Sequence, residues 1–224
     1  MNELKEFFKT TKGHALHKFP HYLEIYERHL EQFRGRPVTL VEVGVGDGGS
    51  LEMWRSYLGP AARVIGIDIS VHPGMPDTVT VVEGDQGNAQ FWYNFFDMVK
   101  VSEIDILIDD GSHVSIDQMV TFRSVFPRLA AGGIYICEDL QTSYQKRFGG
   151  GYRKPGTFIE FAKDLIDQMN AWCTDEFDFV KTDFTKWAYA LHFYTYMLVV
   201  EKRAMDQELY SPIVAGGQHV RGIA

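Results

Sequence analysis

The segment VTLVEVGVGDGGSLEMW, residues 38–54, decides the fold expected for this chain. Its apolar start predicts a buried strand, its glycine-rich middle a tight turn, and SLEMW the beginning of a helix. Gly44, Gly46 and Gly49 have the spacing G-x-G-x-x-G. Glycines at this spacing let the backbone come close to a ligand at the N-terminus of the helix. The segment therefore predicts a strand–turn–helix unit that binds a nucleotide-like ligand.

Further along the chain, the expected strands are continuous apolar runs separated by helical segments. These runs are residues 62–70, 78–86, 104–110 and 134–139. Strands that are apolar on both faces are typical of a parallel sheet covered by helices on both sides. We therefore predict one doubly wound, Rossmann-like α/β domain. It is expected at residues 37–203, between an N-terminal helical extension at residues 1–36 and a C-terminal tail at residues 204–224.

The pattern changes after Asp139. Residues 141–156 are rich in glycine and basic side chains and predict a loop, which we consider either a substrate lid or a solvated surface. Residues 157–172 predict a helix. FDFVKTDF (177–184) and YALHFYTYMLVVEKR (189–203) are each expected to form a strand, and the two strands to pair antiparallel. This ending leaves no second βαβ half for another nucleotide.

Composition narrows the class of protein. The 224 residues carry a formal net charge of −8, which argues against nucleic acid or an anionic membrane as the main partner. No apolar run reaches the roughly 18 residues that a membrane helix needs. Cys137 and Cys173 are too far apart for a CxxC motif, so a disulfide scaffold or thiolate zinc site is not expected. We expect a cytoplasmic protein, because few cysteines suit a reducing compartment.

The glycine turn alone would serve NAD as readily as S-adenosylmethionine, so an NAD-dependent oxidoreductase is one alternative. Glu42 favours the sulfonium cofactor, because a carboxylate two residues before Gly44 would repel a pyrophosphate but suits the ammonium of a methionine moiety. The other interpretation of Glu42 is a charge balanced locally. Asp68 ends the second strand, where an acid accepts hydrogen bonds from ribose hydroxyls. Ser50 in the helix, and Asp85 or Gln86 after the third strand as an adenine contact, complete the expected cofactor site.

Acidic side chains follow two expected neighbouring strands. Asp109 and Asp110 end the fourth strand, and Glu138 and Asp139 end the fifth. Neighbouring strands lie about 4.8 Å apart, so these carboxylates would converge at the edge where ligands bind. Crowded carboxylates repel unless a cation joins them, and oxygen ligands favour Mg²⁺, with Mn²⁺ or Ca²⁺ also suitable and Zn²⁺ less so. The alternatives are a turn that caps the next helix at residues 110–112 and a solvated strand end at residues 138–139.

Five ordered motifs together resemble a known family. They are EVGVGDGGSLEMW, GDQ, IDDGSH, GGIYICEDLQTSY and LHFYTYMLVVEK. The first two motifs are similar to class I S-adenosylmethionine-dependent methyltransferases. The whole set looks like the metal-dependent sugar O-methyltransferases of macrolide antibiotic pathways, of the mycinamicin and demethylmacrocin type. Some members carry an additional N-terminal domain, which we expect this chain to be too short to include.

The resemblance assigns roles within the acidic motifs. It implies metal ligands at Asp110, Glu138 and Asp139, a general base at His113, and a place for Asp109 on the cofactor side. The expected activity is Mg²⁺-dependent methylation of a hydroxyl on a sugar or glycosylated small molecule. A non-catalytic S-adenosylmethionine-binding protein, in which the acids are structural, is the remaining alternative.

Other features carry less weight. His14, His17 and His21 could suggest zinc, but Gly13 and Pro20 interrupt any helix that would present them together, so ordinary surface or lid histidines are expected. His192 is expected to be a satisfied core residue. Aromatic residues gather at residues 187–196 and, with the family resemblance, favour a homo-oligomer.

Overall fold

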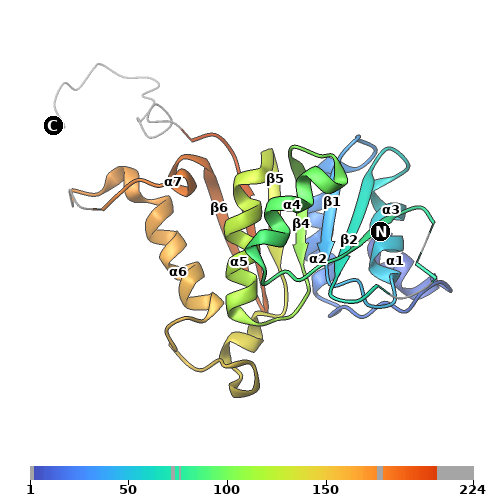
Figure 1. Cartoon of the computed structure of the whole chain (residues 1–224), viewed down its shortest axis with the longest axis horizontal. Helices are drawn as coiled ribbons and strands as arrows, with labels where there is room; N and C mark the ends of the chain where they lie inside the picture. The colour runs from blue at the N-terminus through green and yellow to red at the C-terminus, as the bar shows by residue number, and fades with distance from the viewer. Residues whose placement is uncertain (1–2, 72–73, 76, 176–178, 206–224) are drawn as a thin grey trace, which may run out of the picture.

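The structure of the protein is a computed structural model, which describes residues 3–71, 74–75, 77–175 and 179–205. Seven strands form one sheet in the order β3-β2-β1-β4-β5-β7-β6 (Figure 1). The first five strands are parallel, and β7 pairs antiparallel with both β5 and β6. Their bounds are β1 Thr39–Val43, β2 Arg63–Asp68, β3 Thr80–Glu83, β4 Ile104–Asp109, β5 Leu129–Cys137, β6 Ala188–Tyr194 and β7 Met197–Lys202.

Helices cover both faces of this sheet (Figure 1). The α-helices are α1 Glu3–Thr10, α2 Tyr22–Leu30, α3 Gly49–Leu58, α4 Ala89–Val99, α5 Ser115–Val125, α6 Phe158–Met169 and α7 Asp183–Trp187. One face is covered by α4 to α7 and the other by α1 to α3. Short 3₁₀ turns lie at Glu31–Phe33, Phe126–Arg128, Leu140–Tyr144, Lys146–Phe148 and Ala171–Cys173.

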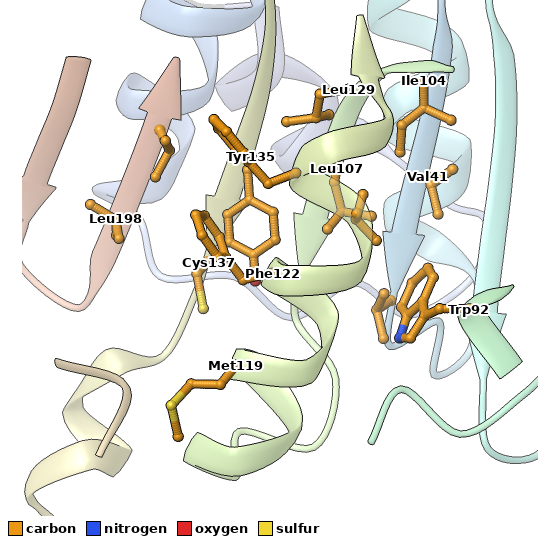
Figure 2. Close-up of a cluster of buried hydrophobic side chains, with 14 of the residues drawn as sticks. Val41, Trp92, Ile104, Leu107, Met119, Phe122, Leu129, Tyr135, Cys137 and Leu198 are labelled. Carbon is orange, nitrogen blue, oxygen red and sulfur yellow. The ribbon is translucent and has the colours of Figure 1, made fainter. Parts of the chain in front are cut away.

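Two hydrophobic clusters, one on each face of the sheet, explain the continuous apolar runs. In β1, Val41 packs in the cluster beneath α4 and α5, whereas Leu40 packs in the cluster beneath α2 and α3. Figure 2 shows the first cluster, where Phe122 of α5 lies against Tyr135 of β5. Because successive side chains of a strand point to opposite faces, the positions of a doubly covered strand are mostly apolar. The predicted doubly wound α/β fold is confirmed.

The prediction for the C-terminal strands was partly wrong. Both antiparallel strands come from residues 188–202, which turn at Thr195 and Tyr196. The earlier segment forms no strand in its described part, residues 179–184. It enters α7 instead, because Thr182 and Thr185 exchange the side-chain and backbone hydrogen bonds of a capping box. Tyr196 takes a positive φ of 66° at the hairpin turn, a conformation that sequence patterns assign to glycine.

Other predictions meet the structure as follows. Residues 141–156 contain two 3₁₀ turns rather than a continuous loop. The N-terminal extension is helical, and Leu4 and Tyr26 are buried in the same cluster as α3, so it packs as part of the domain. The domain boundaries themselves stay predictions, and all but the first two residues of the expected tail lie outside the described part of the chain. Within the described residues, none of the helices has the length and apolar character needed to cross a bilayer.

Candidate active site at the carboxyl edge of the sheet

The glycine turn after β1 lies directly against the end of β4. Asp110 donates its backbone N–H to the carbonyl of Val43 at 2.9 Å. Gly44 has a φ of +88°, and a Cβ on it would lie 2.1 Å from the carbonyl oxygen of Asp110. Glycine is therefore required here both by the backbone conformation and by the close approach of a second strand end. The contact brings the turn and the acidic motif into one site.

Asp68 holds the glycine turn in place. Its Oδ2 accepts hydrogen bonds from the backbone N–H groups of Val45, at 2.8 Å, and Gly46, at 3.1 Å. Gly46 also has a positive φ of 51°, and among the described residues no atom lies within 4 Å of the position that its Cβ would take. Beside it is a cavity of about 360 Å³, whose lining includes Gly44, Gly46, Ser50, Asp68, Asp110, His113 and Asp139.

A second cavity, of about 300 Å³, continues along the edge past Asp68. It is lined by Asp85, Gln86 and Gly111 among others. Asp85 is exposed, and its carboxylate accepts the backbone N–H of Gly87 at 2.8 Å. Gln86 is buried, and its Oε1 accepts the backbone N–H of Ser112 at 2.6 Å. The two adjoining cavities run from the glycine turn to the end of β3, the path expected for a nucleoside-containing ligand.

Asp109 is placed inside the domain rather than on a cavity wall. Its carboxylate is fully buried and accepts hydrogen bonds from Tyr135 Oη at 2.7 Å and Gln86 Nε2 at 2.9 Å. Burial raises the pKa of Asp109, while these two hydrogen bonds oppose the shift. Asp109 therefore orients the side chain of Gln86 through this hydrogen bond. Its place on the cofactor side stays a prediction.

An acid within β1 and the acids that directly follow β4 and β5 meet around one lysine. Lys18 Nζ lies 2.5 Å from Asp110 Oδ2, 3.1 Å from Glu138 Oε2 and 3.3 Å from Glu42 Oε1. The lysine side chain is 2% exposed, and those of Glu42 and Glu138 are 0% and 1% exposed. Burial would lower the pKa of Lys18, but the carboxylates of Glu138, Asp110 and Glu42 raise it well above its usual value, so the ammonium stays charged.

Glu42 contacts two polar groups of the protein. Besides Lys18, it accepts a hydrogen bond from Ser50 Oγ at 2.6 Å. Burial raises the pKa of Glu42, whereas Lys18 and Ser50 oppose that shift. Lys18 is therefore the local partner that would balance the charge of Glu42. A direct contact of Glu42 or Ser50 with a cofactor stays a prediction.

Two tyrosines of α2 bind the acids at the end of β5. Tyr26 Oη donates to Glu138 Oε1 at 2.5 Å, and Tyr22 Oη donates to Asp139 Oδ1 at 2.9 Å. They are four residues apart, so they lie on one face of the helix. Burial raises the pKa of both hydroxyls, Tyr26 well above its usual value. Both tyrosines are therefore protonated hydrogen-bond donors at neutral pH.

His113 lies beside Asp110 and Asp139. Its Nε2 is 3.5 Å from Asp139 Oδ2, and the potential ligand atoms of these three residues lie within 4.8 Å of one another. His113 and Asp139 both have a positive φ of 56°. Strained backbone of this kind persists where surrounding structure enforces it, often at functional sites. Among the described residues, His113 Nδ1 is a buried polar atom that no hydrogen bond satisfies.

The predicted metal ligands therefore form two overlapping groups. Asp110 and Asp139 converge with His113, whereas Asp110 and Glu138 converge on Lys18. Burial and the neighbouring Asp110 carboxylate raise the pKa of Glu138 well above its usual value even with Lys18 beside it. The cluster thus holds more carboxylate than one ammonium offsets. An oxygen-rich donor set with excess negative charge fits a hard divalent cation such as Mg²⁺.

The sequence did not indicate Lys18, Tyr22 or Tyr26 as site residues. The tyrosine spacing of four predicted a shared helix face, but nothing in the sequence connected that face with acids more than 100 residues later. Lys18 stands in an irregular segment that carries no recognisable motif. The histidines nearby behave as expected for ordinary polar residues: His14 bonds Glu52 and Gly74, and His21 bonds the carbonyl of Thr195.

The combination of fold and edge cavities is that of a methyltransferase domain, and the comparisons identify which methyltransferases it resembles. No protein-family model matches the chain. The 8-demethyl-8-alpha-L-rhamnosyl tetracenomycin-C 2'-O-methyltransferase of Streptomyces olivaceus is 38% identical over 194 residues, 82% of this chain and 50% of that protein. Mycinamicin VI 2''-O-methyltransferase of Micromonospora griseorubida is 34% identical over 183 residues, 75% of this chain and 44% of that protein.

A solved structure agrees with these relatives. The MycE methyltransferase of the mycinamycin biosynthetic pathway, in complex with Mg and SAH, matches with a TM-score of 0.79 at 30% identity, over 92% of this chain and 55% of that chain. The same enzyme is also solved with Mg, SAH and mycinamycin VI. The resemblance to sugar O-methyltransferases of antibiotic pathways is confirmed. The chain spans about half the length of the curated relatives it matches.

Proposed function

We propose that this protein is an S-adenosylmethionine- and Mg²⁺-dependent O-methyltransferase that acts on a sugar hydroxyl of a glycosylated small molecule. The observation that carries the proposal is the joining of two sites at Gly44 and Asp110, where the glycine-turn cavity meets the cluster of carboxylates. Relatives named as rhamnosyl tetracenomycin and mycinamicin O-methyltransferases support the acceptor class.

The cofactor would lie along the two cavities of the sheet edge. The backbone at Gly44 and Gly46 leaves room for its methionine portion, and Asp68 faces the position expected for the ribose. Asp85 and Gln86 border the position expected for the adenine. When bound, S-adenosylmethionine supplies an electrophilic methyl group on its sulfonium.

Asp110, Glu138 and Asp139 would hold the cation. When bound there, Mg²⁺ supplies positive charge that lowers the pKa of a hydroxyl placed beside it. Tyr22 and Tyr26 fix the carboxylates of Asp139 and Glu138, so the oxygen ligands are oriented before any ligand arrives. This orientation reduces the reorganisation needed when the acceptor binds.

His113 would take the proton from the acceptor hydroxyl at Nε2, the ring nitrogen that faces Asp139. A neutral imidazole accepts a proton efficiently near neutral pH, and the adjacent carboxylate then stabilises the imidazolium. The hydroxyl oxygen would attack the methyl carbon as this proton leaves. The bond between the methyl carbon and sulfur would break at the same time, with S-adenosylhomocysteine as the neutral thioether leaving group, so no covalent enzyme intermediate is needed.

Calorimetric titration with S-adenosylmethionine and with NAD separates the proposal from the oxidoreductase alternative. We expect saturable binding of S-adenosylmethionine and no binding of NAD at the same concentrations. Selective binding of NAD would remove the methyltransferase proposal. Binding of S-adenosylmethionine without methyl transfer to any glycoside would favour the non-catalytic alternative.

The cellular location and assembly extend the proposal. We expect the protein in the cytoplasm, where a biosynthetic methyltransferase meets its cofactor, and without a nucleic-acid or membrane partner.

We also expect a homo-oligomer, because Tyr189, Phe193 and Tyr196 are exposed aromatic side chains on or beside one hairpin. Light scattering at micromolar concentration measures this, and a monomeric mass contradicts it.

A further inference from the structure

Lys18 lies at the junction of two cavities. One is the cavity at the glycine turn, and the other is a third cavity of about 340 Å³, which is lined by Phe8 and Tyr22 among others. The two cavities share a wall formed by residues 16–18, Asp110 and Asp139. Lys18 is the member of this wall that reaches into the acidic cluster. Its ammonium is nearly inaccessible to solvent and contacts three carboxylates.

The segment that carries Lys18 is fixed on both sides. His14 bonds Glu52 of α3 through its backbone N–H at 3.2 Å and its Nδ1 at 2.7 Å. A Cβ on Gly49 would lie 2.3 Å from the carbonyl oxygen of Ala15, so the segment packs closely on the first turn of α3. His21 bonds the hairpin turn at Thr195 O. Lys18 is thus held over the acids by the packing of residues 11–21.

A divalent cation and this ammonium would need the same oxygen atoms. Lys18 Nζ is 2.5 Å from Asp110 Oδ2 and 3.1 Å from Glu138 Oε2, two of the residues expected to hold the metal. Mg²⁺ binds carboxylate oxygen at about 2.0–2.1 Å. Both cations on one oxygen would face each other across a few ångströms in a nearly dry site, where repulsion is weakly screened. Glu42 is not one of the expected metal ligands, so the ammonium can keep its ion pair with Glu42 when a metal binds.

We propose that Lys18 is the resident counter-cation of the metal site, which the divalent ion must displace from Asp110 and Glu138 in order to bind. This inference rests on the proposed metal site. The ammonium then weakens metal affinity and links metal loading to the position of residues 11–21. Without the metal, the same ammonium keeps the buried carboxylates paired, so the fold tolerates them.

The test is Mn²⁺ binding to the full chain without cofactor or acceptor, followed by the electron paramagnetic resonance signal of free Mn²⁺. Lys18→Met keeps the length of the side chain and removes its charge, so we expect it to bind Mn²⁺ roughly ten-fold more tightly than wild type. Lys18→Arg retains the charge and should remain near wild type. Lys163→Met is the matched control, because Lys163 is an exposed lysine on α6 that pairs with Glu160. It should leave Mn²⁺ affinity unchanged.

A second measurement covers the case in which Lys18→Met folds poorly. In wild type, hydrogen exchange of the backbone amides at residues 14–18 should become faster when Mn²⁺ is added, because the segment loses its ion pairs. Equal or weaker Mn²⁺ binding by folded Lys18→Met, or unchanged exchange in metal-loaded wild type, overturns the inference alone. Absence of saturable Mn²⁺ binding in wild type overturns it together with the proposed metal site.

Discussion

At the scale of single residues, Gly44 sets how closely the two halves of the site approach. A Cβ there would meet the carbonyl of Asp110, whereas the Cβ position of Gly46 has no atom of the described chain within 4 Å. Both glycines have positive φ, so an alanine at either position strains the backbone. Only the alanine at position 44 would also overlap another atom, so the difference between the two variants measures the steric overlap. Gly44→Ala should lower the free energy of unfolding by about 2–4 kcal/mol, and Gly46→Ala by only about 1–2 kcal/mol. Urea unfolding measures both, and equal losses contradict the proposed overlap.

Substitutions of His113 and Asp110 are expected to impair different steps, turnover in one case and metal binding in the other. His113→Ala removes the base but no oxygen ligand, so turnover should fall by roughly 10²–10⁴-fold while Mn²⁺ and S-adenosylmethionine still bind. Asp110→Asn should instead weaken Mn²⁺ binding and leave cofactor binding intact. Steady-state kinetics and binding titrations of both variants distinguish the roles. Near-wild-type turnover of His113→Ala would exclude it as the base.

The sequence indicated the acids and His113 because strand ends and glycine turns leave local patterns. It predicted that the carboxylates converge, but not which other side chains of the protein bind them. Lys18 and Tyr26 reach Glu138 across 120 and 112 positions of the chain, and no local pattern records such a contact. For the same reason, the partner of Glu42 remained open until the fold placed Lys18 beside it.

At the scale of elements, α2 holds the end of β5 through its tyrosine hydroxyls. Tyr26→Phe removes one hydrogen bond to the buried Glu138 carboxylate and should lower the free energy of unfolding by about 1.5–3 kcal/mol. Tyr57→Phe is the matched control, because the buried Tyr57 hydroxyl bonds no group among the described residues. Tyr57→Phe should leave the free energy of unfolding nearly unchanged. Urea unfolding compares them, and equal effects would show that the Tyr26 hydroxyl does not stabilise the fold.

The opposite end of α2 contacts the hairpin through His29. Its Nδ1 lies 3.4 Å from Glu201 Oε1 on β7, and His192 Nε2 on β6 lies 2.8 Å from the same oxygen. His29 Nε2 is 3.0 Å from Tyr194 Oη, and Arg28 donates a hydrogen bond to the same oxygen. Burial first, and then the neighbouring His192, lower the pKa of His29, although Glu201 opposes the shift.

This lowered pKa predicts how stability depends on pH. An unfolded histidine takes up a proton near pH 6.5, whereas native His29 does so only at lower pH. The unfolded state therefore binds more protons as pH falls below about 6.5, so stability should decrease there. Urea unfolding between pH 7.5 and 5.5 measures the slope, which His29→Gln should reduce. An identical slope in the variant contradicts the assignment to His29.

Element predictions succeeded where burial imposes a pattern and failed where it does not. The parallel strands were recognised because both of their faces are covered. The hairpin turn at Tyr196 was missed because a tyrosine with positive φ carries no turn signal, and the capping box at Thr182 was hidden within an apolar-looking run.

In the whole molecule, residues 11–30 complete the site at the carboxyl edge. Residues 11–21 and α2 place one ammonium and two hydroxyls on acids from β1, β4 and β5. The sequence predicted a helical extension with possible lid histidines, but not the contacts of Lys18, Tyr22 and Tyr26 with the acids, because only tertiary packing brings these residues together. The N-terminal segment therefore packs as part of the domain.

The proposed function requires that this edge transfer a methyl group with the help of a divalent cation. The most direct test measures methyl transfer from labelled S-adenosylmethionine to rhamnosylated and other glycoside acceptors, before and after removal of metal by a chelator. We predict that transfer is lost in the chelator, returns when Mg²⁺ is added, and stays absent in Asp110→Asn at the same Mg²⁺ concentration. Undiminished transfer in excess chelator would contradict the account.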